Sequence, residues 1–360
     1  MDVYEELREI LDAHPVGAPK SEAFDDILQA LFTPDEAGLA VHMSFAPKSA
    51  EEIAKAAGIT PEEAGKKLEA MADKVVIFCR EKDGKRTYGL LPTIPGLFEF
   101  PLMKGADTTE LKRLGELWEN YHSGGMGASF AGGETPFARI IPVDRSLTAQ
   151  NRAHPYEEVK RFIDETSYIA LAQCACRVSV KACDAPLDVC LIFGTPGKFL
   201  VQRGYAREIT REEGYKVLDR AEEAGLVHTS NNSADRPTFI CNCCNCCCTI
   251  LRCRTQLDLP NAFATSAFVA QVDAEECTGC ATCADERCPM EAIDIRDDVA
   301  VVNEERCIGC GLCVTYCPSA AITLVRRAEP PEIPANMQEV GIKVAKEKGK
   351  FEKFLKIMQR

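Results

Sequence analysis

Residues 272–293 read VDAEECTGCATCADERCPMEAI, and residues 302–322 repeat this pattern as VNEERCIGCGLCVTYCPSAAI. Each copy has three cysteines spaced as CxxCxxC, then a fourth cysteine followed by a proline. Three thiols at intervals of three on a tight loop can point toward three irons of one iron–sulfur cube, whereas the fourth iron must be reached from elsewhere. The repeat therefore predicts two sites of four thiols each.

This repeat resembles the bacterial-type 2[4Fe-4S] ferredoxins. The resemblance implies a C-terminal ferredoxin-like domain of βαβ repeats over residues 271–328, with two [4Fe-4S] clusters. In that family the fourth cysteine of each motif ligates the cluster of the other motif. Carried over to this chain, the ligand sets are Cys277, Cys280, Cys283 and Cys317 for one cluster, and Cys307, Cys310, Cys313 and Cys288 for the other.

The first copy departs from the family spacing. Four residues separate Cys283 from Cys288, where the second copy has three, so we expect a bulge within residues 284–287. The alternative is a zinc ribbon built from CxxC pairs. It is disfavoured because each half offers four cysteines and ends in a proline.

Cysteine is the residue type that sets this composition apart, with 20 copies in 360 residues, all but Cys79 between Cys174 and Cys317. The N-terminal stretch MDVYEELREIL has neither the basic start nor the apolar run of a signal peptide, so we expect a cytoplasmic protein with cysteines as metal ligands rather than disulfides. The sequence contains no run of about 18 apolar residues, so we expect no membrane span. A net charge of −13 argues against nonspecific nucleic-acid binding.

The region 153–270 carries two further groups of cysteines and is predicted to be an iron–sulfur domain. Neighbouring side chains on an extended strand point to opposite faces, so adjacent cysteines in CNCCNCCC at 241–248 should serve two different sites. The upstream group could complete one of these sites. The two groups are Cys174, Cys176, Cys183 and Cys190, and Cys241, Cys243, Cys244, Cys246, Cys247 and Cys248.

We expect one or two further [4Fe-4S] clusters at these thiols, with zinc as the alternative because soft thiolates bind both metals. Surplus thiols could instead build an unusual cluster at which a substrate is reduced. Cys79 and Cys253 are expected to be packing residues. The basic residues that could offset the charge of the clusters are Arg177, Lys181, Arg252 and Arg254.

The first 100 residues are predicted to form a helical N-terminus and a winged-helix-like unit. The order of four helices and a hairpin around Asp83-Gly84 resembles a winged helix-turn-helix. The expected recognition helix begins with Glu62 and Glu63, which disfavours nucleic-acid binding and favours a docking surface for proteins. The expected helices cover 25–32, 34–43, 49–57 and 61–73, and the expected strands cover 75–79 and 87–91.

Two further segments are predicted outside these domains. Residues 101–152 should be a linker with one helix, 109–121, and a flexible glycine-rich loop, 124–133. Residues 329–360 follow a proline-rich break and should form a basic helical tail. Such a tail could dock on an acidic protein or a membrane surface, or it could fold back on its own chain.

Taken together, the parts resemble a family of 4Fe-4S-binding proteins of anaerobes, with a winged-helix start, a CxC segment, a CNCCxCC segment and a terminal two-cluster ferredoxin. We therefore expect a multidomain α+β protein without assigned catalytic residues. Its expected function is to carry single electrons between a soluble donor and a partner redox enzyme in anaerobic metabolism. The alternatives are an iron–sulfur oxidoreductase with a substrate-reducing cluster in the middle domain, and a redox-responsive winged-helix regulator.

Overall fold

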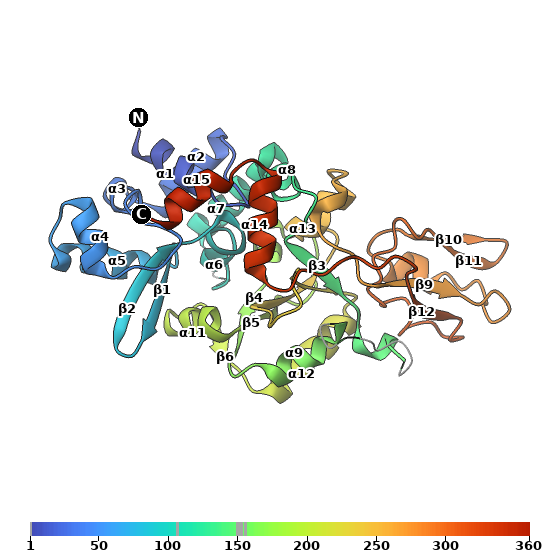
Figure 1. Ribbon diagram of the computed structural model, residues 1–360. Helices are drawn as coiled ribbons and strands as arrows, with labels where there is room; N and C mark the ends of the chain where they lie inside the picture. The colour runs from blue at the N-terminus through green and yellow to red at the C-terminus, as the bar shows by residue number, and fades with distance from the viewer. Residues whose placement is uncertain (1, 106–107, 149–153, 155–156) are drawn as a thin grey trace.

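The computed structural model describes residues 2–105, 108–148, 154 and 157–360. These residues form a mixed α+β structure with a helical N-terminal unit, a six-stranded sheet in the middle and a C-terminal cysteine-repeat module (Figure 1). The last two helices return from this module to the N-terminal unit. Within the described ranges, no helix is both long enough and apolar enough to cross a membrane.

Short helices with marked ends build the N-terminal unit. The side chains of Thr33 and Ser49 each accept a hydrogen bond from the backbone N–H three residues on, and a glutamate there completes each capping box. Leu7, Phe24 and Leu68 are fully buried in the core of this unit. The helices are α1 (Val3–Asp12), α2 (Glu22–Leu31), α3 (Pro34–Ala40), α4 (Ala50–Ala57) and α5 (Pro61–Asp73).

The expected hairpin follows α5, with strands β1 (Ile77–Lys82) and β2 (Lys85–Leu90) paired antiparallel. β1 starts later than expected because Val75 adopts a positive φ of 51° in the turn after α5. Tyr88 donates a hydrogen bond to Glu69 of α5 at 2.5 Å, which ties the hairpin to that helix. The assignment of this unit as a winged helix stays a prediction.

The described residues of 99–148 pack into the core, where we had expected a linker. Trp118 and Tyr121 are fully buried, and the Tyr121 ring stacks on Phe24 with centroids 4.6 Å apart. In the glycine-rich stretch, Phe130 is buried as well. The elements are α6 (Glu99–Leu102), α7 (Thr109–Tyr121), α8 (Gly127–Phe130) and strand β3 (Ala138–Ile141). Residues 106–107 and 149–152 of the expected linker lie outside the described residues.

An antiparallel sheet in the order β3-β7-β8-β5-β4-β6 forms the middle of the molecule. Leu191 of β5 pairs with Ile240 of β8, so one step further along this register Cys190 faces Cys241. The strands are β4 (Ile169–Gln173), β5 (Asp188–Phe193), β6 (Arg207–Glu208), β7 (Val227–Asn231) and β8 (Phe239–Cys243).

Five helices accompany this sheet. α12 packs against α9 and β5, α11 packs against β4 and β5, and α10 packs against α7. In Figure 1, α9 and α12 lie together below the sheet. The helices are α9 (Val159–Glu165), α10 (Ala175–Val180), α11 (Gly194–Gln202), α12 (Arg211–Glu223) and α13 (Thr249–Thr255).

The cysteine-repeat module contains two antiparallel strand pairs. β9 (Phe268–Val272) pairs with β12 (Ile322–Arg326), and β10 (Ile293–Arg296) pairs with β11 (Val299–Val302). A single π-helical turn, Cys283–Arg287, takes up the extra residue of the first copy. Turns replace the α-helices of the expected βαβ repeats in the described residues of this module.

The tail forms α14 (Met337–Glu347) and α15 (Phe351–Met358), which lie against the N-terminal unit (Figure 1). Lys348 donates hydrogen bonds to the carbonyl oxygens of Pro15, at 2.9 Å, and Ser129. Lys350 forms an ion pair with Asp12 at 2.7 Å. Of the expected alternatives for the tail, the structure shows the one in which it folds back on its own chain.

Replacing Lys348 with methionine is expected to lower the free energy of unfolding by about 1–3 kcal/mol, because two backbone carbonyls lose their donor. Anaerobic denaturant unfolding would measure this change. The matched control is Lys346→Met on the exposed face of the same helix, which should change the value by less than about 0.5 kcal/mol. Equal losses in the two variants would contradict the anchoring role of Lys348.

Candidate metal centres

Two cavities in the C-terminal module are each lined by four cysteines. Three cysteines of each cavity come from one repeat, and the fourth comes from the other repeat. The outer cavity is lined by Cys277, Cys280, Cys283 and Cys317. The inner cavity is lined by Cys288, Cys307, Cys310 and Cys313.

Close backbone packing shapes the loops around these cavities. Gly279 and Gly309 both have a positive φ, of 65° and 67°. A Cβ atom would lie 2.5 Å from the carbonyl oxygen of Asp298 at the first position and 2.1 Å from that of Phe268 at the second. Both glycines are therefore required by the turn and by neighbouring backbone, whatever the cavity holds.

The two cavities differ in exposure. Cys280 of the outer set is exposed, whereas Cys307, Cys310 and Cys313 of the inner set are buried. Burial raises the pKa of the Cys310 thiol to about 12. A metal must therefore displace a proton from this thiol, so metal binding in the inner cavity is coupled to proton release.

The inner cavity adjoins the body of the protein. The backbone N–H of Val143, just after β3, donates a hydrogen bond to the carbonyl oxygen of Cys310 at 2.9 Å. Ser266 donates to the carbonyl oxygen of Gly309 at 2.7 Å. The outer set carries the exposed Cys280 and so reaches the solvent, whereas the loop of the inner set is hydrogen-bonded to the body.

In the middle domain, four thiols form a compact group that we call the four-thiol group. Their sulfur atoms all lie within 4.8 Å of one another. Among the described residues, no other set of three or more cysteine, histidine, aspartate or glutamate ligand atoms converges so closely. The members are Cys183, Cys244, Cys246 and Cys247.

Six of the other seven thiols of this domain form a second group, which we call the six-thiol ring. Each thiol affects the ionisation of two others, and these pairwise interactions close into a ring. The pKa values are raised and lowered in turn around it, because each thiol is buried beside two others and loss of a proton from one disfavours its loss from the next. The order around the ring is Cys174, Cys176, Cys248, Cys243, Cys241 and Cys190.

These two groups divide the cysteines differently from the sequence grouping. Cys243 and Cys244 belong to different groups, as do Cys247 and Cys248, which agrees with the expected separation of adjacent cysteines. The expectation fails at Cys246 and Cys247, whose sulfurs lie 3.7 Å apart in one group, because these two residues lie in a turn and not on an extended strand. The four upstream cysteines, Cys174 to Cys190, do not all belong to one group. Cys183 joins the four-thiol group because it lies on the loop between α10 and β5, away from the strand and helix ends that hold the other three.

Neither Cys79 nor Cys253 joins a thiol group in the structure. Cys79 is buried on β1, and Cys253 is buried on α13, with its sulfur 3.1 Å from the carbonyl oxygen of Thr249 and 3.6 Å from His122 Nε2. Both are positions at which a small apolar side chain packs well.

Buried positive charge lies between the two thiol groups. Arg177 is 1% exposed and donates to Cys244 Sγ at 3.6 Å and to the carbonyl oxygen of Asn242 at 3.1 Å. Arg252 makes a bidentate ion pair with Glu119, with both distances 2.7 Å. Two of the four expected basic residues thus lie close to the thiols, and Arg254 instead reaches the carbonyl oxygen of Glu305 in the cysteine-repeat module, at 2.6 Å.

Glu99 on α6 is a residue near the ring that the sequence did not single out. The carboxyl group accepts a hydrogen bond from the backbone N–H of Gly96 at 2.7 Å. Desolvation, together with the nearby Cys176 and Cys190 thiolates, raises the pKa of Glu99 to about 8. No local motif marks this position, because only the fold brings α6 close to the ring.

Comparison with known proteins supports the assignment of the C-terminal module. Residues 300–323 match the family model described as a 4Fe-4S binding domain. This match and the clustered cysteines indicate [4Fe-4S] cluster binding, so the chain is an iron–sulfur protein. No curated protein and no solved structure matches the chain.

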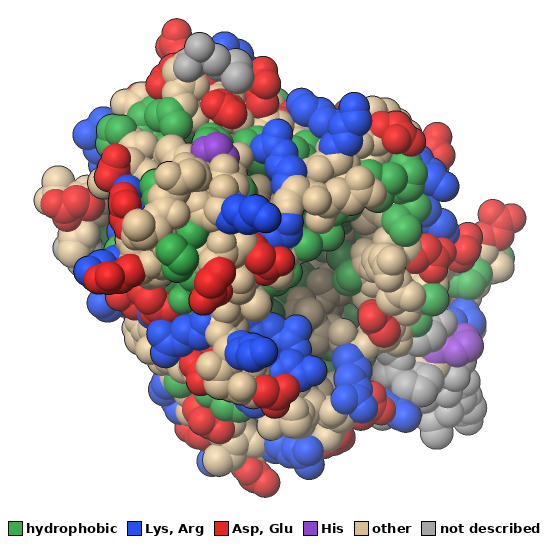
Figure 2. Space-filling view, turned by 60° about the vertical axis from the view of Figure 1, so that its left-hand side comes forward, with side chains coloured by type: hydrophobic (Ala, Val, Ile, Leu, Met, Phe, Trp, Pro, Cys, Tyr) green, Lys and Arg blue, Asp and Glu red, His purple; other side chains and the backbone are tan. Residues whose placement is uncertain are grey.

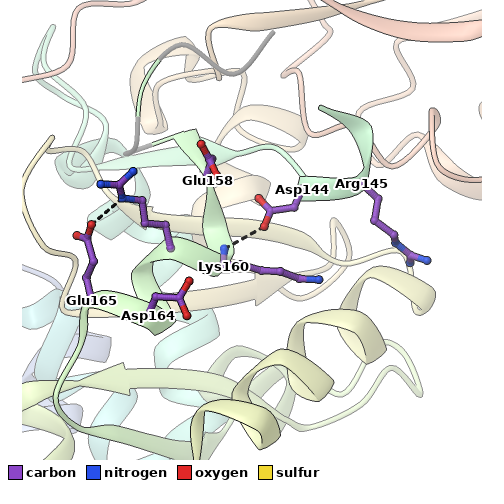
Figure 3. Close-up of a pocket in the computed structure, with 7 residues that line it drawn as sticks. Asp144, Arg145, Glu158, Lys160, Asp164 and Glu165 are labelled. Atoms are coloured by element: carbon purple, nitrogen blue, oxygen red, sulfur yellow. Dashed lines mark hydrogen bonds and ion pairs between the residues drawn. The ribbon is translucent and has the colours of Figure 1, made fainter. Parts of the chain in front are cut away.

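One of the other hollows in the surface has a structural explanation. It lies beside α9 and is lined by charged side chains, including Asp144, Lys160 and Glu165 (Figure 3). The Asp144 carboxylate accepts hydrogen bonds from the backbone N–H groups of Val159 and Lys160, at 3.1 and 3.2 Å, and so caps α9. These charges stabilise the helix, and we assign no further site to them.

Replacing Glu99 with glutamine is expected to remove a pH dependence of stability. A carboxyl group with a pKa raised from 4.5 to about 8 stabilises the fold fully below pH 4.5, and this contribution is lost as the pH rises to about 8. Between pH 6 and 8 the wild-type protein should lose roughly 1 kcal/mol per pH unit from this group. Anaerobic unfolding midpoints across this range would measure the slope.

Glu116→Gln is the control, because Glu116 lies exposed on α7. This variant should keep the wild-type slope, whereas Glu99→Gln should flatten it. The same slope in both variants would show that Glu99 is ionised in the fold.

Proposed function

We propose that the protein is an electron-transfer protein that relays single electrons between a soluble donor and a partner redox enzyme in anaerobic metabolism. The observation that carries this proposal is the pair of cavities in the C-terminal module, each lined by three cysteines of one repeat and one of the other. We assign one [4Fe-4S] cluster to each cavity. Cys317 and Cys288 are then the ligands that cross between the repeats.

The positions of the cavities support an ordered route. The exposed Cys280 makes the outer cluster the natural point of contact with a soluble partner. The inner cluster lies against the body, and α13 leads from there to the six-thiol ring. Cys248 lies at the start of α13, and Arg254 near its end donates to the carbonyl oxygen of Glu305.

We assign a further iron–sulfur cluster to the six-thiol ring. Six thiols exceed the four that a [4Fe-4S] cube uses. No three ring sulfurs converge within 4.8 Å, which is too open for a single tetrahedral ion. Arg177 and Arg252 provide buried positive charge beside these thiols, as a negatively charged cluster requires.

The surplus of two thiols is the observation that favours the second candidate, an oxidoreductase with a substrate-reducing cluster in the ring. Four of the ring cysteines are at most 6% exposed, whereas Cys176 and Cys241 are half-buried. A substrate would therefore need an opening at one of these two positions. The relay requires no such opening, so we place it first.

The regulator alternative has little support from the surface charges. Lys66 and Lys67 of α5 form ion pairs with Glu62 and Glu63 of the same helix, and Arg86 of the hairpin forms ion pairs with Glu81 and Glu69. On the face shown in Figure 2, basic and acidic side chains are interspersed. This favours protein docking over phosphate binding at the N-terminal unit.

Double substitutions test the crossed ligand sets. Cys280→Ala combined with Cys317→Ala removes two ligands of one proposed cluster, so about four irons should be lost per chain. Cys280→Ala combined with Cys288→Ala removes one ligand from each cluster, so about eight irons should be lost. Anaerobic iron and acid-labile sulfide analysis would measure both losses.

Uncrossed ligand sets would give the reverse result, with the larger loss in the Cys280 and Cys317 pair. Cys79→Ala is the control for cysteine replacement as such and should leave the iron content unchanged. A wild-type chain with fewer than about eight irons would overturn the two-cluster assignment itself.

The electron-transfer role predicts reversible reduction without a substrate. Anaerobic reductive titration should show uptake of about two electrons by the C-terminal clusters, with EPR signals that disappear on reoxidation. A tagged native protein should retain a redox enzyme in an anaerobic pull-down, and Cys280→Ala should slow electron delivery to that enzyme. A ring spectrum that shifts when a small molecule is added would favour the oxidoreductase instead.

A further inference from the structure

The four-thiol group connects two loops that are distant in the sequence. Cys183 lies between α10 and β5, and Cys244, Cys246 and Cys247 lie between β8 and α13. Cys244 and Cys247 are buried, whereas Cys183 and Cys246 are half-buried. The group therefore has an inner side against the core and an outer side that an ion can reach.

The spacing of these sulfurs fits one metal ion. The Cys183 sulfur lies 3.8 Å from that of Cys244 and 3.9 Å from that of Cys247, and the sulfurs of Cys246 and Cys247 are 3.7 Å apart. Four thiolates around a zinc ion, with Zn–S bonds of about 2.3 Å, have their sulfurs about 3.8 Å apart. The observed distances match this tetrahedron.

A four-iron cube does not fit the same space. The cube places four irons and four sulfides between its ligands, so the cysteine sulfurs around it must lie much farther apart than around one ion. The proposed ligands in the C-terminal module behave in this way, because no three of their sulfurs lie within 4.8 Å of one another. This contrast within one chain separates the four-thiol group from the cluster sites.

The surroundings of the group suit a charged tetrathiolate centre. Four thiolates and a divalent ion carry a net charge of about −2, which needs donors nearby. The buried Arg177 guanidinium donates to Cys244 Sγ from the side of the ring.

We propose that Cys183, Cys244, Cys246 and Cys247 bind a single tetrahedral divalent ion, zinc or iron, and not a fourth cluster. The ion closes the loop after α10 onto the loop after β8. Cys243 and Cys248 flank this loop and point into the six-thiol ring, so the ion also fixes where two ring ligands lie. This centre does not depend on the proposed electron-transfer role.

Cys246→Ala tests the proposal, because Cys246 is a half-buried member of the group. The full-length protein, purified anaerobically, is analysed for zinc, iron and acid-labile sulfide. We expect the variant to lose about one zinc or one iron per chain, with the sulfide content unchanged. Cys253→Ala is the control, since Cys253 belongs to neither thiol group, and its metal content should equal that of the wild type.

A loss of about four irons with four sulfides would show a cluster at this position and overturn the proposal. Unchanged metal content in Cys246→Ala would overturn it as well. If the variant does not fold, spectroscopy of the native protein still tests for the single ion. X-ray absorption at the zinc edge should show four sulfurs at about 2.3 Å and no iron neighbour, or EPR should show mononuclear high-spin iron. Neither signal in the native protein would refute the single ion.

Discussion

Neighbouring side chains on an extended strand point to opposite faces, and the middle domain depends on this constraint at the end of β8, where Cys243 faces the six-thiol ring and Cys244 the four-thiol group. The turn that follows brings Cys246 and Cys247 back beside Cys244. The segment 241–248 supplies six thiols, three to the four-thiol group and three to the six-thiol ring. The two groups therefore lie back to back, with one stretch of backbone as their common wall. Whatever holds one group in place also orients the other.

Such a wall places much negative charge in a small, buried volume. Isolated buried charges are costly, so the chain brings compensating groups to the same place. Arg177 lies between the two groups, and Arg252 lies beside the ring with Glu119 as its partner. The two arginines add positive charge, whereas Glu99 avoids adding negative charge, because its raised pKa keeps the carboxyl group largely protonated near the thiolates at neutral pH. Charge balance at this site thus rests on residues from three different parts of the chain.

The sequence predicted those features that local chemistry determines. Capping boxes at Ser49–Glu52 and Thr210–Glu213 begin α4 and α12, and Gly225, with a φ of 70°, follows the end of α12, so these boundaries can be read from the local sequence. The separation of Cys243 from Cys244 follows from strand geometry, whereas the pairing of Cys246 with Cys247 is set by the turn after β8.

Features set by tertiary packing were not predicted. Nothing local distinguishes Cys183 from Cys190, yet the loop after α10 takes one to the four-thiol group while β5 takes the other to the ring. The segment expected to be a linker is a part of the core, because Trp118 and Tyr121 have partners only in the folded chain. Glu99 was not predicted either, because only the folded chain brings it close to the six-thiol ring.

The return of the tail to the N-terminal unit determines how the C-terminal module can move. The chain enters the module from the sheet and leaves it toward α14, so both of its ends are attached to the body, and Arg326 pairs with Glu157 at 2.8 Å where it leaves. A module on a single flexible tether can swing between a donor and an acceptor. This module is an insert with two attached ends, so in the proposed relay electrons would cross from it to the body over a constant distance, and the rate would be set by architecture rather than by diffusion of a domain.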